Sequence, residues 1–193
     1  MKVLFLGNDG EDSIALASYI RSSGDTVLYS AQRIDNKLLE SFLPDIIVSY
    51  NYRFILRKEV FDKSPLGTIN LHISYLPWNR GADPNFWSHA ERSPAGVTIH
   101  YIDEGIDTGD IITQKEVSFS HDETLKTSYA RLHQNIRELF QDTWPLIKNG
   151  RHQRVVQQGL GSYHRSKDKE PYLDFLKNGW DTPISLIQGI AKR

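Results

Sequence analysis

Apolar runs and amphipathic segments alternate along the first half of the chain. Three short apolar runs have the length and composition of buried strands, at residues 3–6, 26–29 and 45–50. Between them, residues 13–20 and 36–42 carry apolar positions at helical spacing. Because parallel strands are joined by helices that cover the faces of the sheet, this order predicts an α/β fold with a mostly parallel central sheet flanked by helices.

The second half of the chain continues this pattern and then loses it. Strand-like alternation occurs at residues 69–73, 96–102 and 111–119, and helical patterns occur at residues 84–91 and 123–148. The periodicity fades beyond Gly150. We therefore predict one domain over residues 1–150 and a short C-terminal appendage over residues 151–193 that is not an independent domain.

Charge and cysteine content narrow the possible functions. Lys and Arg total 23 and Asp and Glu total 24, so no overall basic field attracts a polyanion, which argues against a nucleic-acid partner. The absence of cysteine excludes disulfides, a thiol nucleophile and thiolate metal ligands. The apolar run at residues 1–6 is too short for a signal sequence, and no segment has the length of a membrane span. We expect a cytoplasmic protein with no membrane partner.

The turn after the first predicted strand, Gly7-Asn8-Asp9-Gly10, lacks the spacing of a phosphate-binding loop. It contains neither G-x-G-x-x-G nor a lysine-containing phosphate motif, and the nearby carboxylates would repel an anion. We interpret this turn as a simple connection from strand to helix.

Two polar residues lie towards the end of a predicted core strand. Asn70 and His72 are two positions apart, so their side chains project from the same face of the strand, while Ile69, Leu71 and Ile73 occupy the other face. Ligands of open α/β sheets collect beyond the carboxyl ends of the strands. The pair is therefore a candidate catalytic site, although a satisfied polar pair at a strand end would give the same pattern.

Four motifs occur in order through the middle of the chain: Asn70-x-His72-x-Ser74-x-Leu76-Pro77, Arg80-Gly81, Gly96-Val97-Thr98-Ile99-His100 and Asp107-Thr108-Gly109-Asp110. This series resembles the formyltransferases that depend on 10-formyltetrahydrofolate. The resemblance implies a Rossmann-like formyltransferase fold, 10-formyltetrahydrofolate as cosubstrate, and no metal. A metal site can be drawn from the histidines and Asp107, but their spacings form no recognised metal motif.

The resemblance implies a catalytic trio of Asn70, His72 and Asp107 that moves a formyl group to a primary amine. In this interpretation Asn70, together with a protonated His72, stabilises the oxyanion that forms when the amine attacks the formyl carbon. His72 transfers protons, because imidazole titrates near neutral pH. Asp107 orients the imidazole and favours its charged form.

The same resemblance places the folate along the segment that follows the third predicted strand and in the loop that carries Asp107. The pterin is expected to contact backbone groups and an apolar wall there. The expected folate contacts are Tyr50, Asn51, Tyr52, Arg53, Phe54, Ile55, Gly105 and Ile106.

The loop from Tyr75 to Ser88 and the later segment from Gly161 to Asp168 look like those of relatives that modify nucleotide-linked amino sugars. Trp78 offers a stacking face, Asn79 and Asp83 offer hydroxyl partners, and Arg80 offers a partner for a diphosphate. The expected acceptor contacts are Trp78, Asn79, Arg80, Gly81, Asp83 and Tyr163. Trp87, inside the predicted helix, fits a core position better.

The leading interpretation is an enzyme that formylates a nucleotide-linked amino deoxysugar, of the dTDP type, for surface polysaccharide assembly. One alternative is the catalytic core of a methionyl-tRNA formyltransferase, which would present a basic face near the site. Another is a noncatalytic folate or sugar-nucleotide binding module. The apolar residues 184–190 pack either on the core or on a second subunit, so a homodimer is also open.

Overall fold

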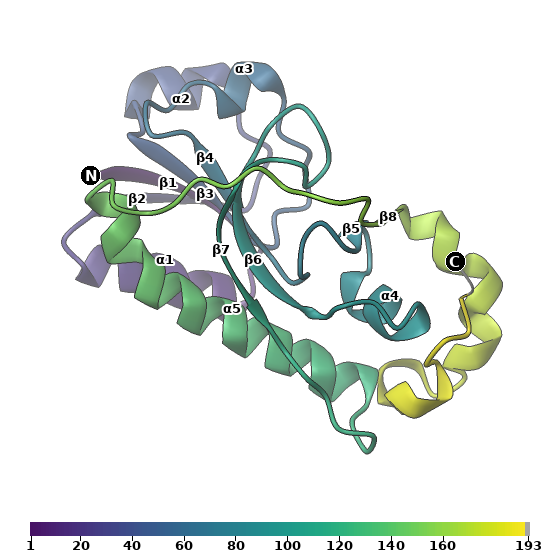
Figure 1. The fold of residues 1–193 in the computed structure, drawn as a ribbon. Coiled ribbons are helices and arrows are strands. Elements are labelled where there is room, and N and C mark those ends of the chain that lie inside the picture. Colours follow the sequence, from purple (N-terminus) through teal and green to yellow (C-terminus); the bar gives the residue numbers. More distant parts are fainter. Residues whose placement is uncertain (192–193) are drawn as a thin grey trace.

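A computed structural model describes residues 1–191, and its centre is a twisted six-stranded sheet with the order β2-β1-β3-β4-β6-β7 (Figure 1). The first four strands in this order run parallel, whereas β6 is antiparallel to both β4 and β7. The strands are β1 (Lys2–Leu6), β2 (Thr26–Ser30), β3 (Ile46–Ser49), β4 (Thr68–His72), β6 (Gly96–Tyr101) and β7 (Ile111–Glu116). The predicted mostly parallel sheet is confirmed.

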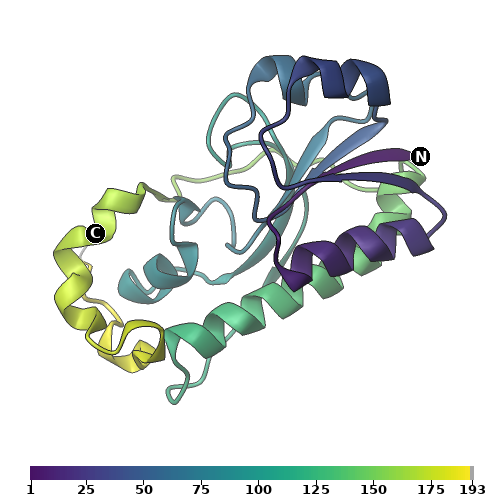
Figure 2. The same cartoon turned by 180° about the vertical axis from the view of Figure 1, so that it is seen from behind.

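Helices cover both faces of the sheet (Figures 1 and 2). One face is covered by the two longest helices, and the other by two short helices that follow β2 and β3. In chain order the helices are α1 (Glu11–Ser22), α2 (Asn36–Phe42), α3 (Lys58–Phe61), α4 (Pro84–Ala90) and α5 (Leu125–Lys148). The short helix α3 was not predicted, because four residues are too few to show a helical period.

Alternation along β1 explains why the sheet has a core on each side. Val3 and Phe5 pack with α1 and α5 in the larger apolar cluster, and Leu4 and Leu6 pack with α2 in a smaller one. All four side chains are fully buried. A strand that is apolar on both faces is typical of a sheet covered on both sides, as the sequence predicts.

The C-terminal segment turns back across the molecule after α5 (Figure 1). Its strand β8 (Tyr163–His164) pairs in parallel with β5 (Arg80–Gly81), and three 3-10 helices follow, at Ser166–Leu176, Gly179–Asp181 and Ile184–Leu186. Ile187 packs in a third apolar cluster with Phe86 and Trp87 of α4. Ile184 and Ile187 therefore pack on the core of the same chain, whereas Leu186 is exposed. Trp87 is the buried residue that the sequence predicts.

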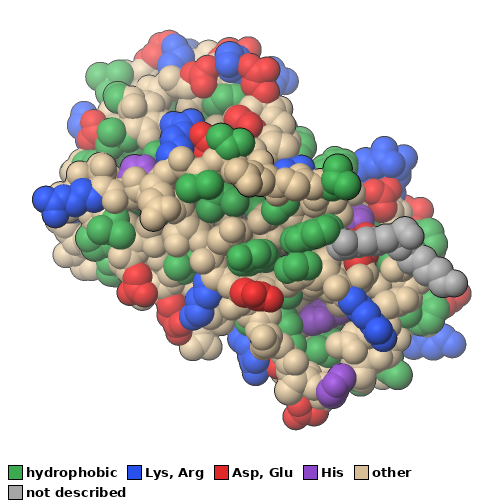
Figure 3. All heavy atoms as spheres, in the orientation of Figure 1, with side chains coloured by type: hydrophobic (Ala, Val, Ile, Leu, Met, Phe, Trp, Pro, Cys, Tyr) green, Lys and Arg blue, Asp and Glu red, His purple; other side chains and the backbone are tan. Residues whose placement is uncertain are grey.

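Figure 3 shows Lys, Arg, Asp and Glu side chains interspersed on one face of the molecule, in keeping with the balanced charge of the chain. Among residues 1–191, no helix combines the length and apolar character needed to cross a membrane.

Two buried histidines predict how stability depends on pH. Burial lowers the pKa of His89 and of His133 to about 4, whereas the pKa of a histidine in the unfolded chain is about 6.5. Between these values the unfolded chain binds more protons than the folded chain, so the free energy of unfolding falls as the pH falls from about 6.5 to 4. We expect the urea midpoint to drop through this window, and to drop less steeply in the double variant His89→Gln/His133→Gln. Equal slopes for the two proteins would contradict this explanation.

Candidate active site

Asn70 and His72 project from one face of β4, as their spacing predicts, and β6 adds a third polar side chain. The antiparallel register pairs Asn70 with His100 and pairs His72 with Thr98. Paired residues of neighbouring strands present their side chains to the same face of a sheet. His100 is 1% exposed and lies beside the Asn70 amide, with 3.3 Å between His100 Nε2 and Asn70 Nδ2.

Asp107 lies in the loop between β6 and β7, where its φ of 53° places it in the left-handed region. Its carboxylate accepts a hydrogen bond of 2.9 Å from the backbone N–H of Gly81 and one of 3.4 Å from Asn70 Nδ2. The Nε2 atoms of His72 and His100 lie 3.7 Å and 3.5 Å from its two oxygens. The structure thus brings the three predicted catalytic side chains together and adds His100.

The charges of this cluster differ from the sequence interpretation in one respect. Burial lowers the pKa of His72 and outweighs the opposing effect of Asp107, so the free imidazole is neutral at neutral pH. Burial also opposes ionisation of Asp107, but the neighbouring histidines and the Gly81 N–H hold the pKa of its carboxyl well below the ordinary range. The site therefore pairs a carboxylate with a neutral base, where we expected Asp107 to favour an imidazolium.

Hydrogen-bond partners set the tautomers of the two histidines. His72 Nε2 faces two acceptors, the Asn79 carbonyl at 3.4 Å and the Asp107 carboxylate, so the neutral ring keeps its proton there and Nδ1 carries the free lone pair. His100 Nδ1 donates to the Tyr101 carbonyl at 2.8 Å, which leaves His100 Nε2 to accept from the Asn70 amide. His100 therefore helps to fix the orientation of the amide.

A cavity of about 180 Å³ opens beside this cluster, and Asn70, His100 and Asp107 line part of it. It shares the wall residues Tyr52, Phe54, Ile55 and Leu56 with a neighbouring cavity of about 340 Å³. Of the residues predicted to hold the folate, the first cavity is lined by Tyr52, Phe54, Ile55, Gly105 and Ile106. An apolar wall next to convergent polar groups is the usual form of a small-molecule site.

The other three predicted folate contacts do not line this cavity. Tyr50 is fully buried in the larger core cluster, and its hydroxyl bonds to His133 Nδ1. Arg53 lies at the surface with its guanidinium 4.7 Å from the centre of the Phe54 ring, and Asn51 occupies a left-handed turn. These positions fit a structural role for Tyr50 and Asn51, because each shapes the chain that leads to the cavity wall.

Two residues predicted to contact the acceptor instead hold the loop in place. Asn79 is 0% exposed, and its side chain bonds to Ser93 Oγ and Ser162 Oγ. The Arg80 guanidinium donates to Gln157 Oε1 at 2.8 Å and 3.1 Å. Neither side chain points into a cavity, as an acceptor contact would. Each is hydrogen-bonded to the C-terminal segment instead.

The C-terminal segment also fixes the backbone of two loops, the one that carries Asp107 and the one that carries Asn79. Gln157 Nε2 donates to the carbonyls of Asp107 and Gly109, both at 2.8 Å. Ser162 Oγ accepts from the backbone N–H of Asn79 at 2.9 Å. The sequence reasoning missed both residues, because isolated polar residues in an aperiodic tail give no signal of their partners.

The remaining predicted acceptor contacts lie around the Gly81 turn. The Asp83 carboxylate forms an ion pair with Lys169, and the 51% exposed Tyr163 lies against Gly81, where an added Cβ would come within 2.9 Å of the ring. Trp78 is half-buried, and its carbonyl accepts a bond from Ser74 Oγ. Within residues 1–191, no group of three or more His, Cys, Asp or Glu side chains is arranged to hold a metal ion.

The fold and this site define an α/β protein with an amide donor, a neutral imidazole base and a buried carboxylate beside a cavity that has one apolar wall. The family described as formyl transferase matches residues 12–143, which is more than half of the chain. The chain belongs to this formyl transferase family.

Similar proteins include sugar N-formyltransferases. The chain is similar to the crystal structure of the formyltransferase PseJ from Anoxybacillus kamchatkensis in complex with UDP-4,6-dideoxy-4-formamido-L-AltNAc and tetrahydrofolate, with 46% identity, a TM-score of 0.92, and 99% of this chain and 100% of that chain covered. A 4-N formyltransferase from Francisella tularensis shares the fold, with 23% identity, a TM-score of 0.79 and 99% and 88% coverage.

The chain is also 37% identical over 158 residues to a methionyl-tRNA formyltransferase from Syntrophus aciditrophicus (strain SB). This match covers 80% of the chain, which spans half the length of that relative. The family is therefore the same as that suggested by the sequence motifs, and the relatives include enzymes of both sugar and transfer-RNA type.

Proposed function

We propose that this protein transfers the formyl group of 10-formyltetrahydrofolate to the primary amine of a nucleotide-linked amino deoxysugar. The observation that carries the proposal is the meeting of Asn70, His72 and Asp107 beside a cavity with an apolar wall, which Asn70 and Asp107 line. Support for the two substrates comes from PseJ, which is 46% identical over nearly the whole chain and was solved with tetrahydrofolate and a formylated UDP-sugar.

The chemistry follows from the charges of the site. The amine nitrogen attacks the formyl carbon, and the carbonyl oxygen becomes an oxyanion. The Asn70 amide stabilises this oxyanion with the N–H that makes the long 3.4 Å bond to Asp107 in the free protein. Neutral His72 takes the proton that the attacking nitrogen loses, and the resulting imidazolium is stabilised by the Asp107 carboxylate. The oxyanion then returns to a carbonyl as the carbon–nitrogen bond to the folate breaks, and the folate N10 takes the proton from the His72 imidazolium. A formamide and tetrahydrofolate leave, and His72 is neutral again.

The folate occupies the cavity lined by Phe54, Ile55 and Ile106 in this proposal, because Asn70 and Asp107 of the catalytic cluster also line that cavity. The nucleotide is a pyrimidine nucleoside diphosphate. The sequence resemblance favours the dTDP type, and the likeness to PseJ supports a UDP-linked acceptor with its amine at C4 of the sugar. We place the reaction in surface polysaccharide assembly, where formylated amino sugars are used.

A transfer-RNA acceptor is the second candidate, because of the 37% identity to a methionyl-tRNA formyltransferase. A polyanion of that size needs a basic surface, and the chain carries 23 basic against 24 acidic residues. The charge balance therefore favours the sugar nucleotide. A noncatalytic binding module would have no reason to keep a base, a carboxylate and an amide donor within bonding distance of one another.

The test is mass spectrometry of reactions that contain 10-formyltetrahydrofolate and one acceptor each. The acceptors are UDP- and dTDP-linked sugars with an amine at C3 or C4, and a formylatable initiator transfer RNA. We expect a formyl-sized mass gain on one sugar nucleotide and none on the transfer RNA. A gain on the transfer RNA alone would favour the second candidate, and folate binding without any transfer would favour the binding module.

A further inference from the structure

The segment that follows α5 runs antiparallel to the end of the loop that carries Asp107. Val155 and Ile111 form an isolated antiparallel bridge, in which the two backbone N–H groups donate to the opposite carbonyls at 2.7 Å and 2.9 Å. In an antiparallel pair the two chains advance in opposite directions, so Gln157 stands opposite Gly109. This register explains why the Gln157 side chain reaches the carbonyls of Asp107 and Gly109.

The amide of Gln157 uses its full hydrogen-bonding capacity in this position. Nε2 carries two N–H donors, and it donates to the carbonyls of Asp107 and Gly109, both at 2.8 Å. Oε1 has two lone pairs, and it accepts from Arg80 Nε at 3.1 Å and from Arg80 Nη2 at 2.8 Å. Because a guanidinium only donates and a backbone carbonyl only accepts, one orientation of the amide satisfies all four groups. Arg80 therefore sets the direction in which Gln157 points its donors.

These hydrogen bonds close a ring through the catalytic carboxylate. Asp107 is held at its backbone carbonyl by Gln157 and at its carboxylate by the N–H of Gly81, the residue that follows Arg80. The φ of Asp107 is 53°, and a non-glycine residue keeps a left-handed conformation when its surroundings support it. The ring provides this support at a residue whose carboxylate must stay beside His72, with 3.7 Å between Asp107 Oδ2 and His72 Nε2.

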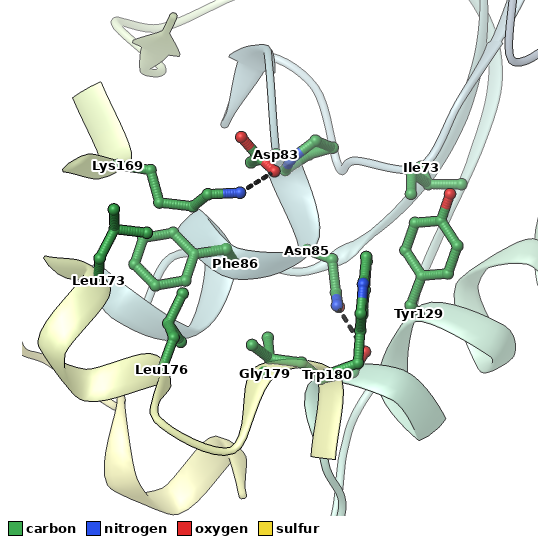
Figure 4. Close-up of a pocket in the computed structure, with 12 residues that line it drawn as sticks. Ile73, Asp83, Asn85, Phe86, Tyr129, Lys169, Leu173, Leu176, Gly179 and Trp180 are labelled. Carbon is green, nitrogen blue, oxygen red and sulfur yellow. Dashed lines mark hydrogen bonds and ion pairs between the residues drawn. The ribbon is translucent and has the colours of Figure 1, made fainter. Parts of the chain in front are cut away.

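The turn that carries Gly81 is also held by contacts that do not involve Gln157. The backbone N–H groups on either side of Gly81 donate to carbonyls of the C-terminal segment, both at 2.9 Å. Lys169, further along the same segment, forms an ion pair with Asp83, the residue before α4 (Figure 4). Removal of the Gln157 amide should therefore release the Asp107 loop and leave the Gly81 N–H in place.

We propose that Gln157 is a positioning residue for formyl transfer, which holds the Asp107 carboxylate beside His72, and that Arg80 acts through the Gln157 amide. The inference rests on the proposed function and deepens it, because it gives the C-terminal appendage a part in the rate of the reaction. Gln157 does not line the proposed folate cavity, so its effect reaches the reaction through Asp107 alone.

The first test is steady-state kinetics of formyl transfer by Gln157→Ala. We expect kcat to fall by about tenfold or more, and KM for both substrates to change by less than about threefold, because a displaced catalytic group slows the reaction without removing a binding contact. Gln157→Glu keeps the size of the side chain and the bonds from Arg80 but loses the donors, so it should lose as much. Gln158→Ala, at the exposed neighbouring glutamine, is the matched control and should keep wild-type kcat.

A double-variant cycle isolates the role of Arg80. If Arg80 acts by orienting the Gln157 amide, then Arg80→Ala lowers kcat, and Arg80→Ala/Gln157→Ala loses no more than Gln157→Ala alone. Arg80→Lys should recover most of the loss of Arg80→Ala, because an ammonium can still donate to Gln157 Oε1. Losses that multiply in the double variant would overturn the assignment of Arg80.

A titration without substrates tests the inference independently of the proposed reaction. Burial lowers the pKa of His72, the Asp107 charge raises it, and His100 lowers it, so a carboxylate that has moved away leaves the pKa lower. NMR titration of the His72 ring, with its signals assigned by comparison with His72→Asn, should show a lower pKa in Gln157→Ala than in the wild type. The control Gln158→Ala should titrate as the wild type does.

The outcomes separate positioning from a general structural role. Unchanged kcat and an unchanged His72 titration in Gln157→Ala would overturn the proposal. A lower kcat that accompanies a lower melting temperature, with the pKa of His72 unchanged, would also overturn it. If the wild type formylates none of the acceptors, the proposed reaction fails, and a lower pKa of His72 in Gln157→Ala still supports the positioning of Asp107 by Gln157.

Discussion

His72→Asn is expected to lower kcat by about 10² to 10⁴-fold, the range that general acid–base catalysis contributes. The buried imidazole is neutral because desolvation lowers its pKa, and its Nδ1 lone pair is the proton acceptor that the substitution removes. Asparagine keeps a polar group of similar size at the end of β4. The measurement is single-turnover formyl transfer with saturating substrates, so that binding does not enter the rate.

Folate affinity separates this outcome from a general loss of structure. His72 does not line the folate cavity, so calorimetric binding of tetrahydrofolate should change by less than about threefold in His72→Asn. His121→Asn, a replacement at an exposed histidine, is the matched control and should retain wild-type turnover. Equal losses of folate binding and turnover would contradict the assignment of His72 as the base.

Asp107→Asn is expected to lower kcat by about 10²-fold or more, because the carboxylate both orients His72 and stabilises the imidazolium that forms during the reaction. Asparagine suits the test because it tolerates the left-handed backbone conformation that Asp107 adopts. Its side-chain oxygen can still accept the bond from the Gly81 N–H. The change therefore removes charge with little strain.

The pH profile of Asp107→Asn provides a second readout with a definite sign. Burial lowers the pKa of His72 and the Asp107 charge raises it, so removal of that charge lowers the pKa further. The reaction needs neutral His72, and its rate rises with pH through this pKa. The acidic limb of kcat/KM should therefore move to lower pH in Asp107→Asn and stay in place in the control Asp142→Asn, which changes an exposed carboxylate on α5. An acidic limb that does not move would remove Asp107 from the His72 pair.

Periodicity was sufficient to predict the elements that are long and apolar. The strands β1 and β3 lie within about two residues of their predicted positions, because fully buried strands show as continuous apolar runs, and β4 does so because its polar and apolar residues alternate. The N-terminus of α5 shows a limit, since the Thr124 capping box starts the helix near but not at the predicted residue. The two-residue strands β5 and β8 have no period to detect, and their pairing depends on the path of the tail.

The candidate site was predictable where neighbours in sequence are neighbours in space. Asn70 and His72 follow from alternation on one strand, but the contact of Asp107 with them came only from the family resemblance, since no local rule relates residues 37 apart. His100 was missed as a site residue because its position opposite Asn70 depends on the register of β4 and β6. Asn79 and Arg80 were assigned to the acceptor from chemistry alone, and their partners Ser162 and Gln157 lie on the distant tail.

The hydrogen bonds from Gln157 to the Asp107 loop have a consequence for folding during synthesis on the ribosome. Chains are made from the N-terminus, and early segments begin to fold before later ones exist. A nascent chain that ended at residue 150 could contain every strand of the six-stranded sheet, with Asn70 and His72 in place on β4. It would lack the tail that holds the carbonyls of Asp107 and Gly109. Catalytic competence therefore arises after the sheet is complete, once the segment that contains Gln157 has emerged.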